Sequence, residues 1–168
     1  MSEYILNPDL DESRMLLALR AAEEAREVGE VPVGAGVFHK GKMIGCAHNQ
    51  RETLQDPTAH AEILAITQAA AALGTWRLNE CEIYVTLEPC AMCAGAMVLS
   101  RIRRLVFGAL DPKAGACGSV LDVLGCEFLN HEVEITSGVL ANSCGTILRD
   151  FFLARREQGR TGPEDQHV

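Results

Sequence analysis

Hydrophobic and polar positions follow two different periods along this chain. Between residues 11 and 28 apolar side chains recur every three or four positions, which predicts an amphipathic helix that ends at Gly29. Two strand-like runs follow, at 33–39 and 42–48, and the Lys40-Gly41 pair between them predicts a hairpin. The chain is therefore expected to open with one helix and one pair of antiparallel strands.

Helical and strand-like segments alternate through the rest of the chain. In order they are a loop at 49–58, a helix at 59–73, a strand at 83–87, a helix at 90–100, a strand at 105–108, a glycine-rich loop at 111–118, a short helix at 120–124, a strand at 133–136 and a helix at 139–157. This order is typical of an α/β fold and predicts a three-layer α/β/α sandwich around a five-stranded mixed sheet. We expect a single domain over residues 1–158 and a disordered tail over 159–168.

Three metal-ligating side chains fall where strands or loops lead into helices. His60 opens one predicted helix, and Cys90 and Cys93 follow Pro89 in another. Cysteines three apart share one helix face, so both sulfurs can reach one metal ion. Three protein ligands around Zn²⁺ leave a fourth position for water, which is typical of a catalytic site.

Glu62 follows the histidine by two residues and is expected to move protons for that water instead of binding the metal. Other readings apply to each half of the motif alone. A lone C-x-x-C can be a redox dithiol, and a structural zinc site would need a fourth Cys or His in a similar close pair. The other five cysteines stand singly among apolar residues, which is typical of packed thiols: Cys46, Cys81, Cys117, Cys126 and Cys144.

Composition narrows the class of protein. The chain has 168 residues, of which 48% are hydrophobic and 23% charged, as in an ordinary globular protein. It contains no run of about 20 apolar residues that could span a bilayer and no secretory signal pattern at its start. Two of the seven cysteines are predicted to bind a metal as free thiolates, which a reducing compartment preserves. We therefore expect a cytoplasmic protein.

The net charge of −8 argues at first against a nucleic-acid partner. The charge is unevenly distributed, however, because residues 1–30 hold eight acids against three arginines. Two segments are locally basic, 101–113 and 149–160. A basic patch on an acidic protein can bind RNA, although each of these cations could equally be a solvated surface charge.

At this point the sequence resembles the cytidine deaminase-like superfamily and, within it, the bacterial tRNA-specific adenosine deaminases. H-x-E together with P-C-x-x-C is the signature of zinc deaminases of nucleobases. The resemblance runs over residues 11–158 and is carried by the segments 30–35, 56–62, 84–96, 100–102 and 111–113, and by Asp150-Phe151-Phe152 followed by Arg155-Arg156.

The resemblance implies a substrate, a cofactor and an assembly. The substrate would be a tRNA anticodon stem-loop, with inosine formed at the wobble position, and each subunit of a homodimer would hold one Zn²⁺. Asn49 matches the family position that contacts the target nucleoside, and Val31 would line the pocket beside it. Simple core packing is the alternative for Val31.

Additional RNA contacts are expected from the last helix. Phe151 and Phe152 point about 100° apart on a helix, so one should face the core while the other could stack on a base. Arg155 and Arg156 lie next to this pair. The remaining phosphate contacts are expected from Lys113 and Arg101.

Two alternative functions stay open from the sequence. A deaminase of a free base or nucleoside, such as guanine or cytosine, would use the same zinc chemistry. A zinc-stabilised RNA-binding module without enzymatic activity would need neither the free coordination position nor Glu62.

Overall fold

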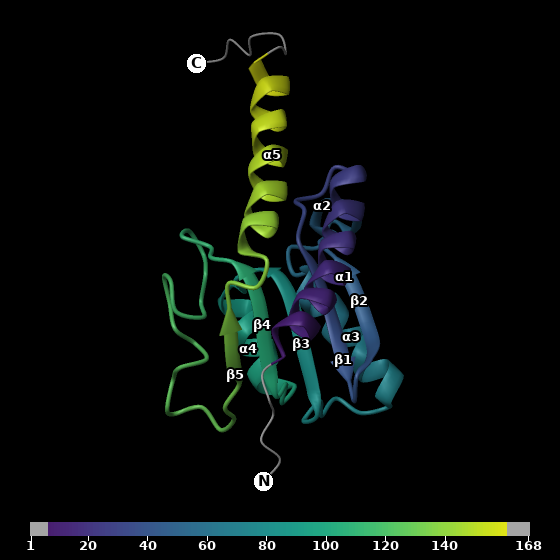
Figure 1. The fold of residues 1–168 in the computed structure, drawn as a ribbon, viewed down its shortest axis with the longest axis vertical. Helices are drawn as coiled ribbons and strands as arrows, with labels where there is room; N and C mark the ends of the chain where they lie inside the picture. Colours follow the sequence, from purple (N-terminus) through teal and green to yellow (C-terminus); the bar gives the residue numbers. More distant parts are fainter. Residues whose placement is uncertain (1–6, 161–168) are drawn as a thin grey trace.

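A computed structural model describes residues 7–160, whose helices and strands form three layers (Figure 1). In chain order the elements are α1 (Pro8–Glu27), β1 (Gly34–His39), β2 (Lys42–His48), α2 (Arg51–Leu54), α3 (Ala61–Leu73), β3 (Cys81–Leu87), α4 (Ala91–Leu99), β4 (Arg104–Ala109), β5 (Glu134–Ser137) and α5 (Ala141–Arg160). The five strands form one sheet in the order β2-β1-β3-β4-β5. β1 pairs antiparallel with β2 and β3, whereas β3, β4 and β5 are parallel.

Helices cover both faces of this sheet, so the predicted α/β/α sandwich with a mixed sheet is confirmed (Figure 1). α1 and α5 pack on one face, and α3 and α4 lie on the other. The larger apolar cluster lies under α3 and α4, and a smaller one lies under α1. Within residues 7–160 no helix is both long and apolar enough to cross a membrane.

α1 lies unusually close to β1. Asn7 caps the helix, since its side chain accepts a hydrogen bond from the N–H of Leu10 at 3.3 Å. Farther along, a Cβ placed on Gly34 would lie 1.9 Å from the carbonyl oxygen of Ala18 and 2.6 Å from the nitrogen of Ala22. The backbone of the helix therefore contacts the backbone of the strand, which only glycine at position 34 allows.

The hairpin between β1 and β2 forms as predicted. Lys40 and Gly41 both have positive φ, at 48° and 82°, as a two-residue type I′ turn requires. The C-cap of α3 is Gly74, directly after the predicted end of this helix at 73, and it lies in the left-handed region at φ 66°.

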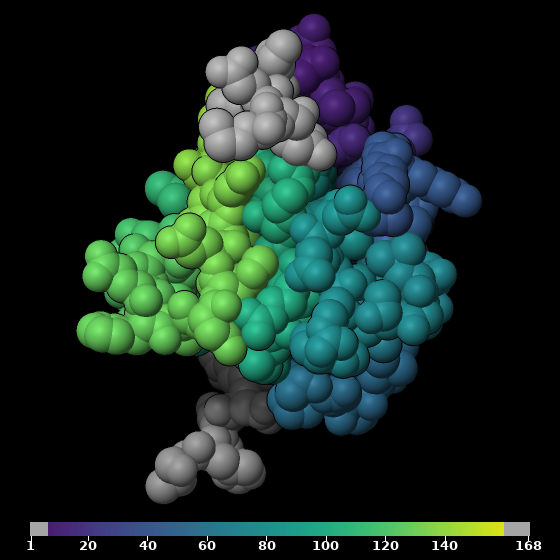
Figure 2. Space-filling model, turned by 90° about the horizontal axis from the view of Figure 1, so that it is seen from below, coloured from purple at the N-terminus to yellow at the C-terminus, as the bar shows by residue number. Residues whose placement is uncertain are grey.

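The structure differs from the sequence-based expectation in three elements. The short helix predicted at 120–124 is wrong: this segment is an irregular loop, and Val120 and Leu121 are more than half exposed. In Figure 2 the loop between β4 and β5 (green) stands out on the side of the molecule away from the segment that includes α3. The structure adds α2 inside the predicted loop 49–58, and α5 begins only after Gly138 and Leu140, whose positive φ values of 83° and 51° preclude an earlier start.

α5 also continues to Arg160, beyond the predicted boundary of the tail. Residues 161–168, where the rest of that tail was expected, lie outside the described residues.

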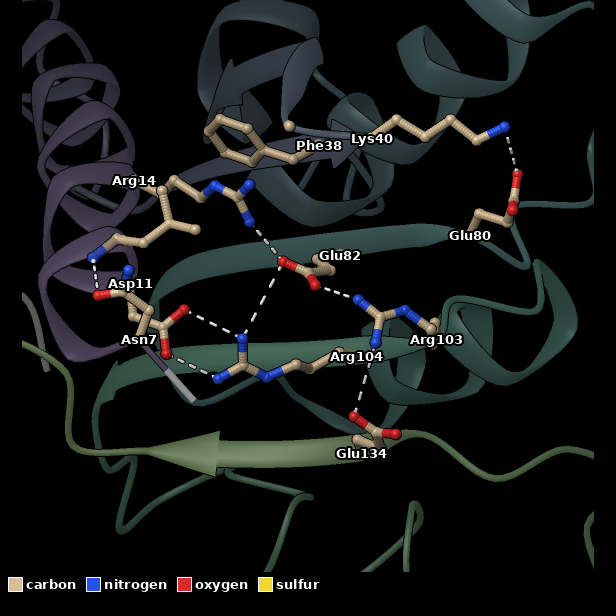
Figure 3. A pocket seen from close by; sticks show the side chains of 12 residues that line it. Asn7, Asp11, Arg14, Phe38, Lys40, Glu80, Glu82, Arg103, Arg104 and Glu134 are labelled. Carbon is tan, nitrogen blue, oxygen red and sulfur yellow. Dashed lines mark hydrogen bonds and ion pairs between the residues drawn. The ribbon is translucent and has the colours of Figure 1, made fainter. Parts of the chain in front are cut away.

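A network of charged side chains joins α1 to the sheet, at the end where β3 and β4 begin (Figure 3). Arg104 donates hydrogen bonds to both carboxylate oxygens of Asp11, at 3.0 and 2.7 Å, and Arg14 and Arg103 both pair with Glu82. A hollow of about 480 Å³ lies among these groups. Its four acids and four bases pair with one another, so the network serves to dock the helix.

Candidate metal centre and active-site pocket

Two helix starts bring the predicted metal ligands together at the opposite end of the sheet. His60 stands at the N-cap of α3, Cys90 at the N-cap of α4, and Cys93 in the first turn of α4. A local turn delivers the histidine, because the Asp56 carboxylate accepts hydrogen bonds from the N–H and the hydroxyl of Thr58 at 2.8 and 2.7 Å. Segments 30 residues apart in the sequence thus meet in one cluster.

The distances within this cluster fit a tetrahedral zinc ion. His60 Nδ1 lies 3.6 Å from the Sγ atoms of both Cys90 and Cys93, and the ligand atoms of all three lie within 4.8 Å of one another. Zn–N and Zn–S bonds of about 2.0 and 2.3 Å at tetrahedral angles would separate nitrogen from sulfur by about 3.5 Å, close to these distances. The part of the chain that the structure describes contains no second group of this kind.

The electrostatics of the cluster also favour a cation. Hydrogen bonds from Cys93 and His60 lower the pKa of Cys90 to about 3. The Cys90 sulfur and burial raise the pKa of Cys93, and the hydrogen bond to Cys90 raises the pKa of His60. One negative charge therefore forms readily, whereas a second thiolate needs the positive charge of a metal.

Glu62 lies in the first turn of α3, next to the cluster. Its side chain is buried, with 4% of the residue exposed, and hydrogen bonds to Cys93. Burial raises the pKa of this carboxyl above its ordinary value. A carboxyl that holds a proton more tightly than usual can both take a proton and return it near neutral pH.

A pocket of about 220 Å³ opens onto His60, Glu62 and Cys90. The structure places both predicted pocket residues, Val31 and Asn49, in its wall. Three further charged residues of the wall were missed by the sequence analysis: Arg51, Asp111 and Glu88. No local pattern distinguishes Arg51 from other charged residues, although Glu88 and Asp111 both lie in segments that carry the family resemblance.

A second buried carboxylate holds Asn49 in the pocket wall. Glu30 accepts a hydrogen bond from Asn49 Nδ2 at 3.4 Å and another from the backbone N–H of Thr53 at 2.6 Å. Burial would raise the pKa of Glu30, but the hydrogen bonds from Thr53 keep it below the ordinary value. The charged form of Glu30 thus ties the Asn49 side chain to the short helix α2.

The predicted RNA-contacting residues of the last helix line a separate hollow of about 490 Å³. Its walls are Phe152 and four cations: Lys113, Arg149, Arg155 and Arg156. Phe151 is buried, with 7% exposed, while Phe152 is 44% exposed, and their rings meet edge to face at 5.4 Å. The structure thus separates the roles of the two phenylalanines, with Phe152 on the open side.

Arg155 connects this hollow to the metal site. Besides lining the hollow, it lines a small cavity between α2 and the segment 29–31, and it donates a hydrogen bond to the carbonyl oxygen of Gly29 at 3.4 Å. Three residues of that small cavity, Val31, Asn49 and Arg51, also line the metal-site pocket. The three cavities therefore form a series from α5 to the metal cluster.

Arg101 lies apart from the residues that line the pocket and the hollow. Arg101 follows the end of α4, whose nine residues span about 13 Å and begin at the cluster. Its guanidinium donates hydrogen bonds to the carbonyl oxygen and the side chain of Asn130, at 2.7 and 3.0 Å. Arg101 therefore supports the loop between β4 and β5, and its contact with a phosphate stays a prediction.

The fold and the site define a deaminase of nucleobases, and comparison with known proteins agrees. The model of the MafB19-like deaminase family matches residues 10–156. The chain is 51% identical over 148 residues to the tRNA-specific adenosine deaminase of Bacillus subtilis, covering 88% of this chain and 92% of that protein. It is 54% identical over 136 residues to the protein of the same name from Aquifex aeolicus, covering 81% and 89%.

Solved structures show the same likeness. A structure from a study of A-to-I editing by tRNA deaminases at the wobble position matches with a TM-score of 0.79 and 43% identity, over 81% of this chain and 99% of that one. A guanine deaminase from Nitrosomonas europaea matches with a TM-score of 0.72 and 29% identity, over 83% of each chain. The chain belongs to the family of tRNA-specific adenosine deaminases.

Proposed function

We propose that this protein hydrolyses the amino group of the wobble adenosine in a tRNA anticodon, forming inosine and ammonia. The observation that carries the proposal is the series of cavities from the basic hollow on α5 to the metal cluster. A deaminase of a free base would not need the four cations of this hollow, because a free base carries no phosphates. Single-stranded loops can extrude a base without breaking a duplex, so an anticodon loop suits this arrangement.

The metal would be one Zn²⁺ per subunit, held by His60, Cys90 and Cys93. Bound there, zinc would make water a strong nucleophile at neutral pH. Three ligand atoms with tetrahedral spacing, two of them sulfurs, support this choice of metal.

Glu62 carries out the proton transfers in this proposal. Its carboxylate takes a proton from water as the oxygen adds to the amine-bearing ring carbon, and passes that proton to the neighbouring ring nitrogen. A second proton, from the added hydroxyl, then reaches the amino group through Glu62, and the carbon–nitrogen bond breaks to release ammonia. The buried position of Glu62 beside the cluster supports this role.

The cations of the hollow would bind the phosphates of the stem-loop. Among the described residues, none of Lys113, Arg155 and Arg156 forms an ion pair with an acid. Phe152, with its exposed ring, would stack on a loop base, which contributes about 1–3 kcal/mol. Few cations are involved, so the affinity should depend less steeply on salt than that of a strongly basic RNA-binding protein.

The test is ammonia release from an anticodon stem-loop with adenosine at the wobble position, compared with free adenosine, adenine, guanine and cytosine. We expect release from the stem-loop alone, and none from a stem-loop with guanosine at that position. Release from free guanine or cytosine, without release from RNA, would favour the second candidate. That candidate is a free-base deaminase, which the likeness to the Nitrosomonas europaea guanine deaminase favours.

We also propose that the protein acts as a homodimer in the cytoplasm, where tRNA is found. Three leucines are more than half exposed and offer apolar surface to a second subunit: Leu99 at the end of α4, and Leu110 and Leu121 between β4 and β5. Sedimentation equilibrium should give twice the monomer mass, and a monomer at micromolar concentration would contradict the proposed assembly.

A further inference from the structure

Glu88 is a buried carboxylate that the proposed reaction does not use. It lies between the end of β3 and the metal ligand Cys90, only 2% exposed. No cation pairs with it among residues 7–160; its partners are instead donors of the segment 111–119. A carboxylate buried without a cation must be stabilised by hydrogen bonds. The residues that donate these hydrogen bonds therefore indicate the role of Glu88.

Both oxygens of Glu88 are saturated by this one segment. Oε1 accepts hydrogen bonds from the backbone N–H groups of Cys117 and Ser119, at 3.0 and 3.1 Å. Oε2 accepts hydrogen bonds from the N–H of Asp111 at 3.0 Å and the hydroxyl of Ser119 at 2.6 Å. One side chain thus holds both ends of the segment.

The segment also fits closely around the carboxylate. A Cβ on Gly115 would lie 2.3 Å from Glu88 Oε2, so the chain approaches as only glycine allows. Gly115 forms a backbone bridge with Cys90, and the N–H of Ala116 donates to the carbonyl oxygen of Pro89 at 2.8 Å. The segment therefore lies against the residues that deliver the metal ligand.

The same segment carries residues of two cavities. Asp111 and Ala114 line the metal-site pocket, and Lys113 lines the basic hollow. The Asp111 carboxylate accepts hydrogen bonds from the N–H groups of Lys113 and Ala114, at 2.9 and 3.2 Å, so these three residues form one turn. The position of this turn depends on how the segment is held.

We propose that Glu88 is a positioning residue, whose carboxylate fixes the segment 111–119 so that Asp111 and Lys113 bind the nucleotides around the target base. This inference rests on the proposed function, since the segment would bound an RNA site. Glutamate is needed because three of the four partners are backbone N–H groups, which can only donate. A glutamine would turn an NH₂ group toward at least one of these N–H groups and leave it without an acceptor.

The experiment compares Glu88→Gln with the wild type in the zinc-loaded protein, using the anticodon stem-loop as substrate. We expect KM to rise about tenfold, because the negative charge and at least one of its hydrogen bonds are lost, while kcat stays within about threefold. Metal content should be unchanged. Amide hydrogen exchange should accelerate in residues 111–119 and stay constant in α3.

A matched control separates positioning from general stability. Glu82→Gln alters another buried carboxylate, at the far end of the molecule, and should lower the melting temperature without raising KM. If Glu88→Gln behaves like this control, with unchanged KM and unchanged exchange in 111–119, the proposal is wrong.

Ser119 gives a second route if Glu88→Gln fails to fold. Ser119→Ala removes one of the four hydrogen bonds and should raise KM and exchange slightly, whereas Ser119→Thr keeps the hydroxyl and should restore both. Equal behaviour of the two variants would contradict the proposal. If the wild type releases no ammonia from the stem-loop, the proposed function fails, and the exchange data still decide whether Glu88 holds the segment.

Discussion

At the scale of single residues, the side chains that begin α3 and α4 face the metal cluster and do not cap their own helices. Neither His60 nor Cys90 makes a side-chain capping hydrogen bond, although each stands at an N-cap. The partial positive charge at a helix start lowers the pKa of a nearby thiol, which is useful for a metal ligand. The side chains of His60 and Cys90 therefore contribute to the metal cluster and leave the starts of α3 and α4 without side-chain caps.

Cys90→Ala should abolish both metal binding and activity. It removes the thiol whose pKa is already lowest and leaves two ligands, too few to hold zinc firmly. Metal content by mass spectrometry and ammonia release are the measurements. Cys126→Ala, at an exposed cysteine outside the cluster, is the control and should keep both. Full metal content in Cys90→Ala would show that the ligand set is wrong.

Glu62→Gln should keep the metal and the RNA affinity but lose about 10²–10⁴-fold in kcat, the usual contribution of a general acid–base group. The amide has nearly the same shape but cannot accept the proton from water. Single-turnover ammonia release measures the effect, with the exposed Glu127→Gln as control. Near-normal turnover would exclude the proton-transfer role of Glu62.

The meeting of His60, Cys90 and Cys93 could be predicted because these residues lie in short motifs, each at the start of a helix. The pocket wall could be predicted only in part. Val31 and Asn49 were expected there, whereas Arg51 enters the wall through the unpredicted helix α2. Arg101 is close to the cysteines in sequence, but α4 separates it from the cluster, and its phosphate contact stays a prediction.

At the scale of elements, α5 extends the site beyond the sheet. The side chains of residues 152–159 are all exposed, and Figure 1 shows this part of the helix standing clear of the other layers. Its first half is anchored, since Cys144 packs against Gly108 of β4 and belongs to the smaller apolar cluster. One half of the helix therefore supports the fold and the other half presents the basic hollow.

Replacing Arg155 and Arg156 together with alanine should weaken binding of the stem-loop without unfolding the protein, because both side chains are exposed. The slope of log affinity against log salt should fall by about 1 to 2, as expected for the loss of two phosphate contacts. Lys42→Ala with Arg77→Ala removes the same charge from exposed positions outside the three cavities. If both double variants bind alike, the arginines of α5 make no specific contribution.

Element types were predicted better than element boundaries. Long apolar periods identified α1, α3 and the strands, because packing against the sheet requires those periods. The prediction of a short helix at 120–124 was wrong because only Val123 and Leu124 pack on the core, whereas Val120 and Leu121 face solvent in an irregular loop. α2 was missed because a single turn of helix is too short to show a period of apolar residues. This turn is held instead by the hydrogen bond from the Thr53 N–H to Glu30.

At the scale of the whole molecule, the two ends of the sheet have different tasks. The cluster and its pocket lie where β3 ends, and the paired charges lie where β3 begins (Figure 3). The charged end should therefore govern stability and leave the chemistry unaffected.

Asp11→Asn should lower the free energy of unfolding by about 3 kcal/mol, as when a buried ion pair loses one partner. Loss of one partner from a buried ion pair costs about 3–5 kcal/mol. We expect the low end of this range because the Glu82 carboxylate remains 4.0 Å from Arg104 and still offers it a negative charge. Denaturant unfolding measures it, and the activity per folded molecule should not change. A loss below about 1 kcal/mol would mean that the pair contributes little.

The same pair predicts how stability depends on pH. Burial would raise the pKa of Asp11, but hydrogen bonds from Arg104 and Tyr84 keep it below the ordinary value. Its contribution is therefore complete above the unfolded-state pKa of about 3.9 and is lost as the pH falls through the folded-state pKa. The difference in stability between the wild type and Asp11→Asn should shrink over that interval, and a constant difference would contradict this.

The contact between Gly34 and α1 has a consequence for how this protein can vary. A side chain at position 34 would push Ala18 and Ala22 outward, and α1 leads through Gly29 into Glu30 and Val31. Glu30 in turn holds Asn49, so a displacement of α1 would reach the wall of the pocket. A residue that lines no part of the pocket thus sets the position of its wall, and a side chain at position 34 should disturb the pocket and destabilise the fold together.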